Sequence, residues 1–124
     1  MATQKEKPIA EDIDWTRAST VTAGVDIGAA SAKIVILADD QIVAYSSIVR
    51  AGDTVGSAQR VLEMALASAG MKLENIQSIV ATGYGRVMVP QASRNISEVS
   101  CHARGAHWFF PEVRTVIDMG AQDC

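Results

Sequence analysis

Cysteine, positive charge and long apolar runs are all scarce in this sequence. Two cysteines, Cys101 and Cys124, are too few for a disulfide framework and lack Cys-x-x-Cys spacing, so we expect reduced thiols. Eleven Lys and Arg against 14 Asp and Glu give a net charge of -3, which leaves no basic face for a nucleic-acid backbone. Apolar runs such as residues 34–38 are far shorter than the roughly 20 residues of a membrane-spanning helix. These features argue against nucleic-acid-binding and membrane-spanning functions.

The first residues also lack the apolar segment that a secretory signal requires, so we expect a cytoplasmic protein. Residues 1–19 are polar and of mixed charge, which indicates a partly disordered N-terminal extension. The chain as a whole is 48% hydrophobic and 20% charged, an ordinary globular composition. Residues 20–124 are therefore expected to form one domain with a modest core.

Three strands are expected in close succession after the extension. Residues 20–27, 32–38 and 41–49 are rich in β-branched and apolar side chains. The connections, 28–31 and 39–40, have the length and the residues of hairpin turns, so the strands should be antiparallel neighbours. A Rossmann unit would instead continue from its glycine turn straight into a helix.

The second half of the chain predicts two helices and two further strands. Apolar residues at helical spacing indicate a helix over 55–69, capped by Asp53 or Thr54 and ended by Gly70. A strand over 77–82 follows, then a helix over 96–109 that ends before Pro111. Asn95 is expected to cap this helix, with Glu98 in a capping box. A last strand is expected over 114–118, which completes an α/β fold with a mixed sheet.

The bend between the first two strands is the first candidate site. Small residues let backbone N–H groups approach an anion, so this turn can bind phosphate without a net positive protein. The residues of the turn are Gly28, Ala29, Ala30 and Ser31. Asp26 could hold Mg²⁺ through water, and Lys33 supplies a positive charge for phosphate oxygens. The same residues are also compatible with a plain hairpin that carries a surface Asp and Lys.

A similar arrangement recurs at residues 118–123. There an apolar strand again ends in an aspartate, Asp118, and a turn of small or polar residues follows, comprising Gly120, Ala121 and Gln122. A nucleotide site needs two such units, one holding the phosphates and one orienting the attacking water, so Asp26 and Asp118 are the candidate catalytic carboxylates. A coincidental pair of acidic strand ends is the alternative.

Three motifs in order give the sequence a family resemblance. They are Ala-Thr-Gly-Tyr-Gly-Arg at 81–86, Ser-Glu-Val-Ser-Cys-His-Ala-Arg-Gly-Ala at 97–106 and Val-Ile-Asp-Met-Gly-Ala-Gln-Asp at 116–123. With the turn at 28–31, they resemble the ASKHA superfamily, which includes actin and many sugar kinases. Within it they resemble the BadF/BadG/BcrA/BcrD-type ATPases, which include 2-hydroxyacyl-CoA dehydratase activators and benzoyl-CoA reductase ATPase subunits. The motif Cys-His-Ala-Arg-Gly-Ala and the N-terminal extension resemble the reductase subunits more than the dehydratase activators.

The resemblance implies an actin-like, ribonuclease H-like fold, of which residues 20–124 would be the N-terminal lobe. It implies ATP, Mg²⁺ and a [4Fe-4S] cluster as cofactors, with the cluster ligands beyond residue 124 and neither Cys101 nor Cys124 among them. The expected function is ATP-driven electron transfer from ferredoxin for benzoyl-CoA reduction. The expected partners are a second ATPase subunit and the catalytic reductase subunits. Alternatives are a dehydratase activator, a sugar or carboxylate kinase of the superfamily, and a non-catalytic assembly fragment.

Some positions depart from the family pattern or carry a second interpretation. Ala29 stands where the family commonly has Ser, so one hydroxyl contact to phosphate is missing. Ala121 stands where the family commonly has Gly, and its Cβ limits backbone conformations with positive φ. Cys101 beside His102 could suggest a metal pair, but helix neighbours point in different directions, which favours a structural thiol. Arg86 could contact nucleotide or another subunit, or lie exposed in a turn.

Overall fold

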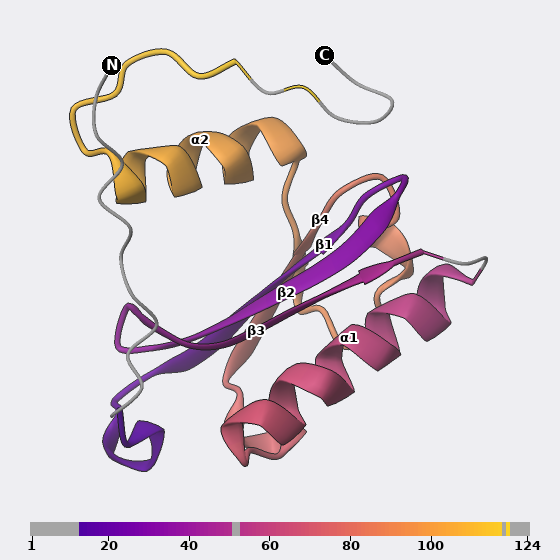
Figure 1. Ribbon diagram of the computed structural model, residues 1–124, viewed down its shortest axis with the longest axis vertical. Coiled ribbons are helices and arrows are strands. Elements are labelled where there is room, and N and C mark those ends of the chain that lie inside the picture. The colour runs from indigo at the N-terminus through magenta and orange to yellow at the C-terminus, as the bar shows by residue number, and fades with distance from the viewer. Residues whose placement is uncertain (1–12, 51–52, 118, 120–124) are drawn as a thin grey trace.

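The protein is a mixed α/β domain, seen here in a computed structural model that describes residues 13–50, 53–117 and 119 (Figure 1). Five strands and two α-helices make up the described part. They are, in chain order, β1 (Val21–Ile27), β2 (Ser31–Ala38), β3 (Gln41–Val49), α1 (Thr54–Ala69), β4 (Ser78–Thr82), β5 (Arg94–Asn95) and α2 (Glu98–Phe109). Three short 3-10 turns, η1 (Trp15–Arg17), η2 (Leu73–Asn75) and η3 (Arg86–Met88), lie between or before them.

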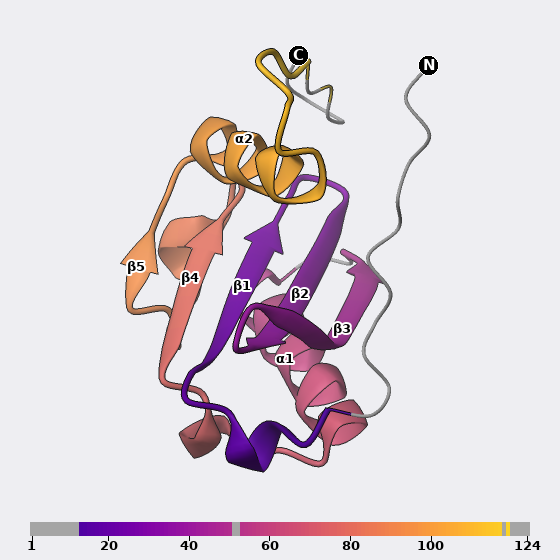
Figure 2. The same ribbon diagram turned by 90° about the vertical axis from the view of Figure 1, so that its left-hand side faces the viewer.

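The strands form one sheet in the order β3-β2-β1-β4-β5 (Figure 2). β1, β2 and β3 are joined by tight turns and pair antiparallel, whereas β4 pairs parallel with both β1 and β5. The turn between β2 and β3 places Asp39 and Asp40 at φ 47° and 65°, a conformation that Asp tolerates better than most residues. The predicted mixed sheet with antiparallel opening strands is thereby confirmed.

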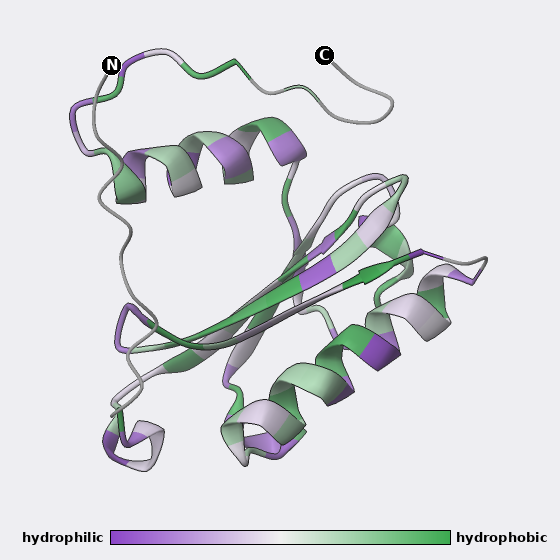
Figure 3. Cartoon of the chain, viewed as in Figure 1, coloured by the Kyte–Doolittle hydropathy of each residue, from purple (hydrophilic) through white to green (hydrophobic). Residues whose placement is uncertain are grey.

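The core lies between the sheet and α1. Residues of β1 and β2 alternate between buried and more exposed positions, and the buried set includes Val25, Ile27, Ile34 and Ile36. Helix α1 covers this face with its apolar side, which the predicted periodicity identified. Figure 3 shows the apolar residues along the strands and on α1. α1 and the sheet therefore form the two packed layers around the core.

Helix α1 begins and ends with the chemistry that the sequence predicts. Asp53 is the N-cap, and its carboxylate accepts from the N–H groups of Val55 at 3.1 Å and Gly56 at 3.0 Å. Gly70 ends the helix in the left-handed conformation, with φ 62°. Of the two caps considered, Asp53 therefore takes the role, and Thr54 is the first helical residue.

The segment before β1 contacts the far end of α1. Trp15, in η1, is partly buried against the core, and its indole Nε1 donates to the carbonyl oxygen of Ala69 at 2.9 Å. Ile13 and Ala18 also pack against the core. Within the segment expected as an extension, residues 13–18 thus make specific contacts, whereas residues 1–12 lie outside the described residues.

Helix α2 lies on the opposite face of the sheet from α1 (Figure 1). It begins at Glu98, two residues later than predicted, because Ser97 is the N-cap and its hydroxyl accepts from the N–H of Ser100 at 3.4 Å. Asn95, the predicted cap, instead belongs to β5. None of the residues of α2 is buried, so this helix packs loosely. No helix among the described residues has the length and apolar character to cross a membrane.

The strand predicted over 114–118 is not formed in its described part. Residues 114–117 have no regular secondary structure, and Ile117 is 83% exposed. A strand needs a neighbour to accept and donate its backbone hydrogen bonds. The outer edge of β4 is taken by β5, which pairs Val80 with Arg94 and Ala81 with Asn95. The free edges of the sheet are those of β3 and β5, and residues 114–117 pair with neither of them in the described part of the chain.

Candidate functional site

The candidate residues of the first motif gather where β1 ends. Asp26 is the next-to-last residue of β1, and its neighbours in register are Lys33 on β2 and Thr82 on β4. Residues opposite one another in a sheet project from the same face, so all three side chains share the face away from α1. β1 and β4 are parallel, and ligands of α/β sheets commonly bind at the carboxyl ends of such strands.

The small-residue turn is held by an arginine that the sequence did not single out. The N–H of Gly28 donates to the carbonyl oxygen of Ser31 at 2.9 Å, which closes the turn. Arg50 donates from Nη1 to the carbonyl oxygen of Gly28 at 2.8 Å and from its own N–H to that of Ala30 at 3.0 Å. Its Nη2 also donates to the hydroxyl of Thr54, at the start of α1. Arg50 therefore connects the turn to α1, and within the turn it binds carbonyl oxygens.

A glycine loop after β4 forms a second wall beside Asp26. Gly83 has φ 90°, and a Cβ there would lie 2.5 Å from Oδ1 of Asp26 and 2.4 Å from the carbonyl oxygen of Ile27. The N–H of Gly85 donates to that same carbonyl at 3.0 Å. Only glycine allows both the conformation and the close approach. The two glycines thus bring the backbone of this loop against the aspartate.

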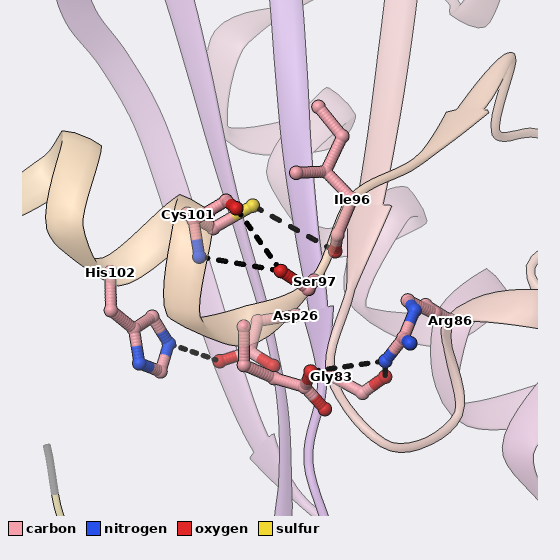
Figure 4. Close-up of polar contacts among 9 residues, drawn as sticks. Asp26, Gly83, Arg86, Ile96, Ser97, Cys101 and His102 are labelled. Atoms are coloured by element: carbon pink, nitrogen blue, oxygen red, sulfur yellow. Dashed lines mark hydrogen bonds and ion pairs between the residues drawn. The ribbon is translucent and has the colours of Figure 1, made fainter.

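Arg86 joins this loop to α2 (Figure 4). Its Nη1 donates to the carbonyl oxygen of Gly83 at 3.1 Å and to Oε2 of Glu98 at 3.0 Å. Both side chains are about one-third exposed, at 33% for Arg86 and 31% for Glu98. The capping-box role predicted for Glu98 is therefore wrong, because its carboxylate reaches outward to Arg86 while Ser97 caps the helix. Arg86 is a bridge between loop and helix.

His102 reaches Asp26 from α2. Its Nε2 lies 3.8 Å from Oδ2 of Asp26, and the side chains are 38% and 27% exposed (Figure 4). The neighbouring Cys101 points elsewhere and donates from Sγ to the carbonyl oxygen of Ile96 at 3.9 Å. The two adjacent residues thus act separately, as the helix geometry predicted. No pattern in the sequence signalled the His102–Asp26 contact, because the two side chains lie far apart along the chain.

Thr82 adds a buried oxygen next to Asp26. The residue is 7% exposed, and its Oγ1 has no hydrogen-bond partner within the described chain. An unpaired buried hydroxyl is costly, so one of this kind usually marks strain or a place for a ligand or water. Its position after an apolar strand in Ala-Thr-Gly-Tyr-Gly-Arg is the signal that could have identified it from sequence.

The second predicted motif lies almost wholly outside the described residues. Asp118, Gly120, Ala121 and Gln122 lie outside the described residues, and Met119 between them is exposed. Among the residues that the structure describes, no group of three or more His, Cys, Asp or Glu side chains could hold a metal ion. Only the first motif, with Asp26, the turn and Lys33, therefore has an observed geometry.

A separate cavity of about 740 Å³ lies between the sheet and α2. Apolar and small residues such as Gly24, Val35, Val80 and Trp108 line it. It does not include Asp26 or the turn at residues 28–31, so it is distinct from the candidate site.

The 3-2-1-4-5 sheet, with a small-residue turn and an aspartate at its carboxyl edge, defines a lobe of the actin-like ATPase fold. The same fold is seen at 13% identity in a ROK hexokinase from Thermus thermophilus, with a TM-score of 0.53 over 71% of this chain and 37% of that chain. Residues 23–124 match the family model of the BadF/BadG/BcrA/BcrD ATPases, and the chain belongs to this family.

Several characterised relatives are dehydratase activators. The activator of lactoyl-CoA dehydratase from Anaerotignum propionicum is 44% identical over 102 residues, which are 82% of this chain and 39% of that protein. The solved component A of (R)-2-hydroxyglutaryl-CoA dehydratase from Acidaminococcus fermentans has a TM-score of 0.79 at 42% identity, covering 84% of this chain and 40% of that one. The activator of 2-hydroxyisocaproyl-CoA dehydratase from Clostridium difficile, solved with bound ADPNP, has a TM-score of 0.77 at 44% identity over 83% and 38%.

Benzoyl-CoA reductase is a more distant relative than the motif at residues 101–106 suggested. One of the polypeptides of that enzyme from Thauera aromatica is 30% identical over 107 residues, covering 82% of this chain and 38% of that polypeptide. The 44% identity with the lactoyl-CoA dehydratase activator is well above this value. The ATPase family is thus established, and the preference for the reductase within it is not supported. The chain spans about two fifths of the length of these curated relatives.

Proposed function

We propose that this chain is the phosphate-binding part of an ATPase that activates a partner enzyme acting on a CoA thioester. The observation that carries the proposal is the placement of Asp26 beside the turn at residues 28–31, on an actin-like sheet whose relatives are activating ATPases. The C. difficile relative was solved with the ATP analogue ADPNP, which supports a nucleotide as ligand. Activity, substrate and partners of the whole protein are all part of this proposal.

The residues present fit a hydrated Mg²⁺ ion and a nucleotide phosphate. Asp26 offers carboxylate oxygens and Thr82 offers an unpaired buried hydroxyl, and Mg²⁺ prefers oxygen ligands while it keeps several waters. Arg50 engages carbonyl oxygens of the turn, which leaves the N–H groups of Ala29 and Ala30 for an anion. Asp26 and Thr82 would thus face the metal of a Mg·ATP complex, and the turn would face its phosphates.

In this proposal, each residue has a separate task. Asp26 holds the water shell of the metal through its carboxylate. The backbone at Gly28, Ala29, Ala30 and Ser31 contacts phosphate oxygens, and Lys33, which is exposed and opposite Asp26 in register, adds positive charge. The bound Mg²⁺ would neutralise charge that develops on the transferred phosphoryl group. For Ala29, the missing hydroxyl removes one contact, which Ser31 can supply from the other end of the turn.

The second motif would complete the nucleotide site. Asp118 would orient the attacking water, and the turn with Gly120, Ala121 and Gln122 would contact the phosphates from the other side. Residues 114–117, which lead into this motif, are exposed and belong to no strand of the described sheet, so in this proposal the motif stands apart from the sheet that carries Asp26. The proposal thus assigns the two motifs to two walls of one cleft.

A [4Fe-4S] cluster is part of the proposed function, but the described residues do not fit it. Cys101 is half-buried, donates to the backbone at Ile96 and has no further cysteine near it in the described chain. Cluster iron is held by several cysteine thiolates, so its ligands would come from other parts of the full-length protein.

Activation of a 2-hydroxyacyl-CoA dehydratase is the favoured role. The identities of 40 to 44% with three such activators support it over benzoyl-CoA reductase, for which the identity is 30%. A subunit of benzoyl-CoA reductase is the second candidate. It is supported by membership of the family and by the motif Cys-His-Ala-Arg-Gly-Ala at residues 101–106. In either role ferredoxin would donate the electrons, and a second copy or a related ATPase subunit would be the neighbour.

The nucleotide site is tested by removing one carboxylate charge. In the full-length protein, Asp26→Asn is expected to lower Mg-dependent ATP hydrolysis by about 100-fold or more, because the amide is a poorer partner for a metal-bound water. Asp40→Asn is the matched control, since Asp40 is an exposed aspartate in the turn between β2 and β3. Equal rates in the two variants would remove Asp26 from the mechanism.

The partner enzyme is tested by substrate. The full-length protein is purified with its partners and supplied with ATP and reduced ferredoxin. We expect dehydration of a 2-hydroxyacyl-CoA that depends on ATP. Reduction of benzoyl-CoA in the same assay would support the second candidate and contradict the first.

A further inference from the structure

Helix α2 approaches the candidate site with two side chains on one of its sides. Glu98 and His102 are four residues apart, so they lie one turn apart on the same face of the helix. Glu98 reaches Arg86 at 3.0 Å, and His102 reaches Asp26 at 3.8 Å. Both contacts end at the same edge of the sheet, in the loop after β4 and at the end of β1.

These polar contacts matter because α2 contributes no buried residue to the core. None of its residues is buried, and the cavity of about 740 Å³ separates much of it from the sheet. Its first turn is fixed by the Ser97 cap and by the N–H of Ile96, which donates to the carbonyl oxygen of Ala81 at 3.0 Å. The Arg86–Glu98 pair, one turn before His102, thus helps to hold this part of α2 beside the end of β1.

The carboxylate of Asp26 is enclosed from two sides. Its Oδ1 lies against Gly83, where even a methyl group would come within 2.5 Å, and its Oδ2 faces Nε2 of His102. A carboxylate turns about its own bonds unless a neighbouring group favours one orientation. The imidazole Nε2 of His102, at 3.8 Å, is within ion-pair range and slightly beyond hydrogen-bond length. Outer donors of this kind orient the groups that hold a metal in many metal sites.

We propose that His102 is a positioning residue for Asp26. It orients Oδ2, so that the remaining lone pairs of the carboxylate face the water shell of Mg²⁺ at the proposed nucleotide site. The proposal rests on the proposed function of Asp26 and adds α2 to the machinery of that site. The loss of His102 should weaken the hold on Mg²⁺ and leave the chemical step at saturating Mg²⁺ nearly unchanged.

The test compares two histidines of the same helix in the full-length protein. His102→Ala removes the imidazole beside Asp26, and His102→Gln restores an N–H group of similar reach. His107→Ala is the matched control, because His107 is exposed in the last turn of α2. ATP hydrolysis is measured against Mg²⁺ concentration at saturating ATP. Binding of Mn²⁺ with ADPNP is measured separately by electron paramagnetic resonance, which needs no turnover.

We expect His102→Ala to raise the Mg²⁺ concentration at half-maximal rate about fivefold, with kcat changed less than about twofold, and to weaken Mn²⁺ binding similarly. His102→Gln should recover most of this loss, and His107→Ala should match the wild type. The proposal is overturned if His102→Ala behaves as His107→Ala, or if kcat falls while the metal requirement stays the same. If the wild type itself binds no Mn·ADPNP, the proposed function fails, which is a different result from failure of His102 alone.

Discussion

Replacing Gly83 with alanine tests whether the glycine loop and Asp26 are as closely fitted as the structure indicates. A residue with a Cβ at φ 90° is strained by about 1–3 kcal/mol. The added Cβ would also lie 2.4 Å from the carbonyl oxygen of Ile27, which is backbone and cannot turn aside. Moving this carbonyl weakens its hydrogen bond from Gly85, which is worth about 1 kcal/mol. A total destabilisation of about 3 kcal/mol follows.

Two other glycines provide controls for this substitution. Gly70 has φ 62° and open space around it, so Gly70→Ala should show only the conformational strain, about 1 kcal/mol. Gly24 has neither a positive φ nor any atom within 4 Å of a built Cβ, so Gly24→Ala should be neutral or slightly stabilising. Thermal unfolding followed by circular dichroism should place the Tm of Gly83→Ala more than about 10 °C below that of Gly24→Ala. A Tm for Gly83→Ala equal to that of Gly70→Ala would refute the close fit.

Three further predictions concern stability. Thr82→Val should raise the free energy of unfolding by about 1 kcal/mol in urea titrations, because it removes an unpaired buried hydroxyl at constant shape; a loss of stability would show that Oγ1 has a partner. Leu62→Ala should cost about 2–4 kcal/mol, since Leu62 is 2% exposed in the core, whereas Met64→Ala, at a position 46% exposed, should cost well under about 1 kcal/mol in the same titrations. Hydrogen bonds from the N–H groups of Thr20 and Ser19 lower the pKa of Asp39 in the folded state, so its contribution to stability is present above the ordinary pKa of 3.8 and is lost as pH falls through the folded value. Unfolding curves from about pH 6 to 2 should therefore show a smaller loss of stability in Asp39→Ala than in the wild type.

The sequence predicted the antiparallel opening of the sheet, α1 and its caps because these depend on local patterns. Alternating apolar residues and two short turns determine β1 to β3, and Asp53 and Gly70 are cap residues wherever they occur. β5 was missed because Arg94 and Asn95 have no strand preference and pair with β4 only through backbone contacts. The opposite error occurred at residues 114–117, which have the strand pattern without a neighbouring strand.

The candidate site was predictable only in its local part. Asp26, the turn and Lys33 are close in sequence, and hairpin pairing brings them together without any knowledge of the rest of the fold. Arg50, Thr82 and His102 reach the same edge from three other elements, so their roles depend on how the sheet and α2 are assembled. Glu98 illustrates the limit of a local rule, since a capping box was expected and a contact with Arg86 is found.

The indole of Trp15 ties the N-terminal segment to Ala69, at the end of α1 remote from Thr54 and Arg50. α1 has 16 residues and is therefore about 24 Å long. The side chain of Arg17, in η1, is 88% exposed and therefore offers a place for a fluorescent dye remote from the proposed nucleotide site. With a second dye on α2, the distance between the two dyes in single molecules would report any displacement of α2 relative to the sheet and α1.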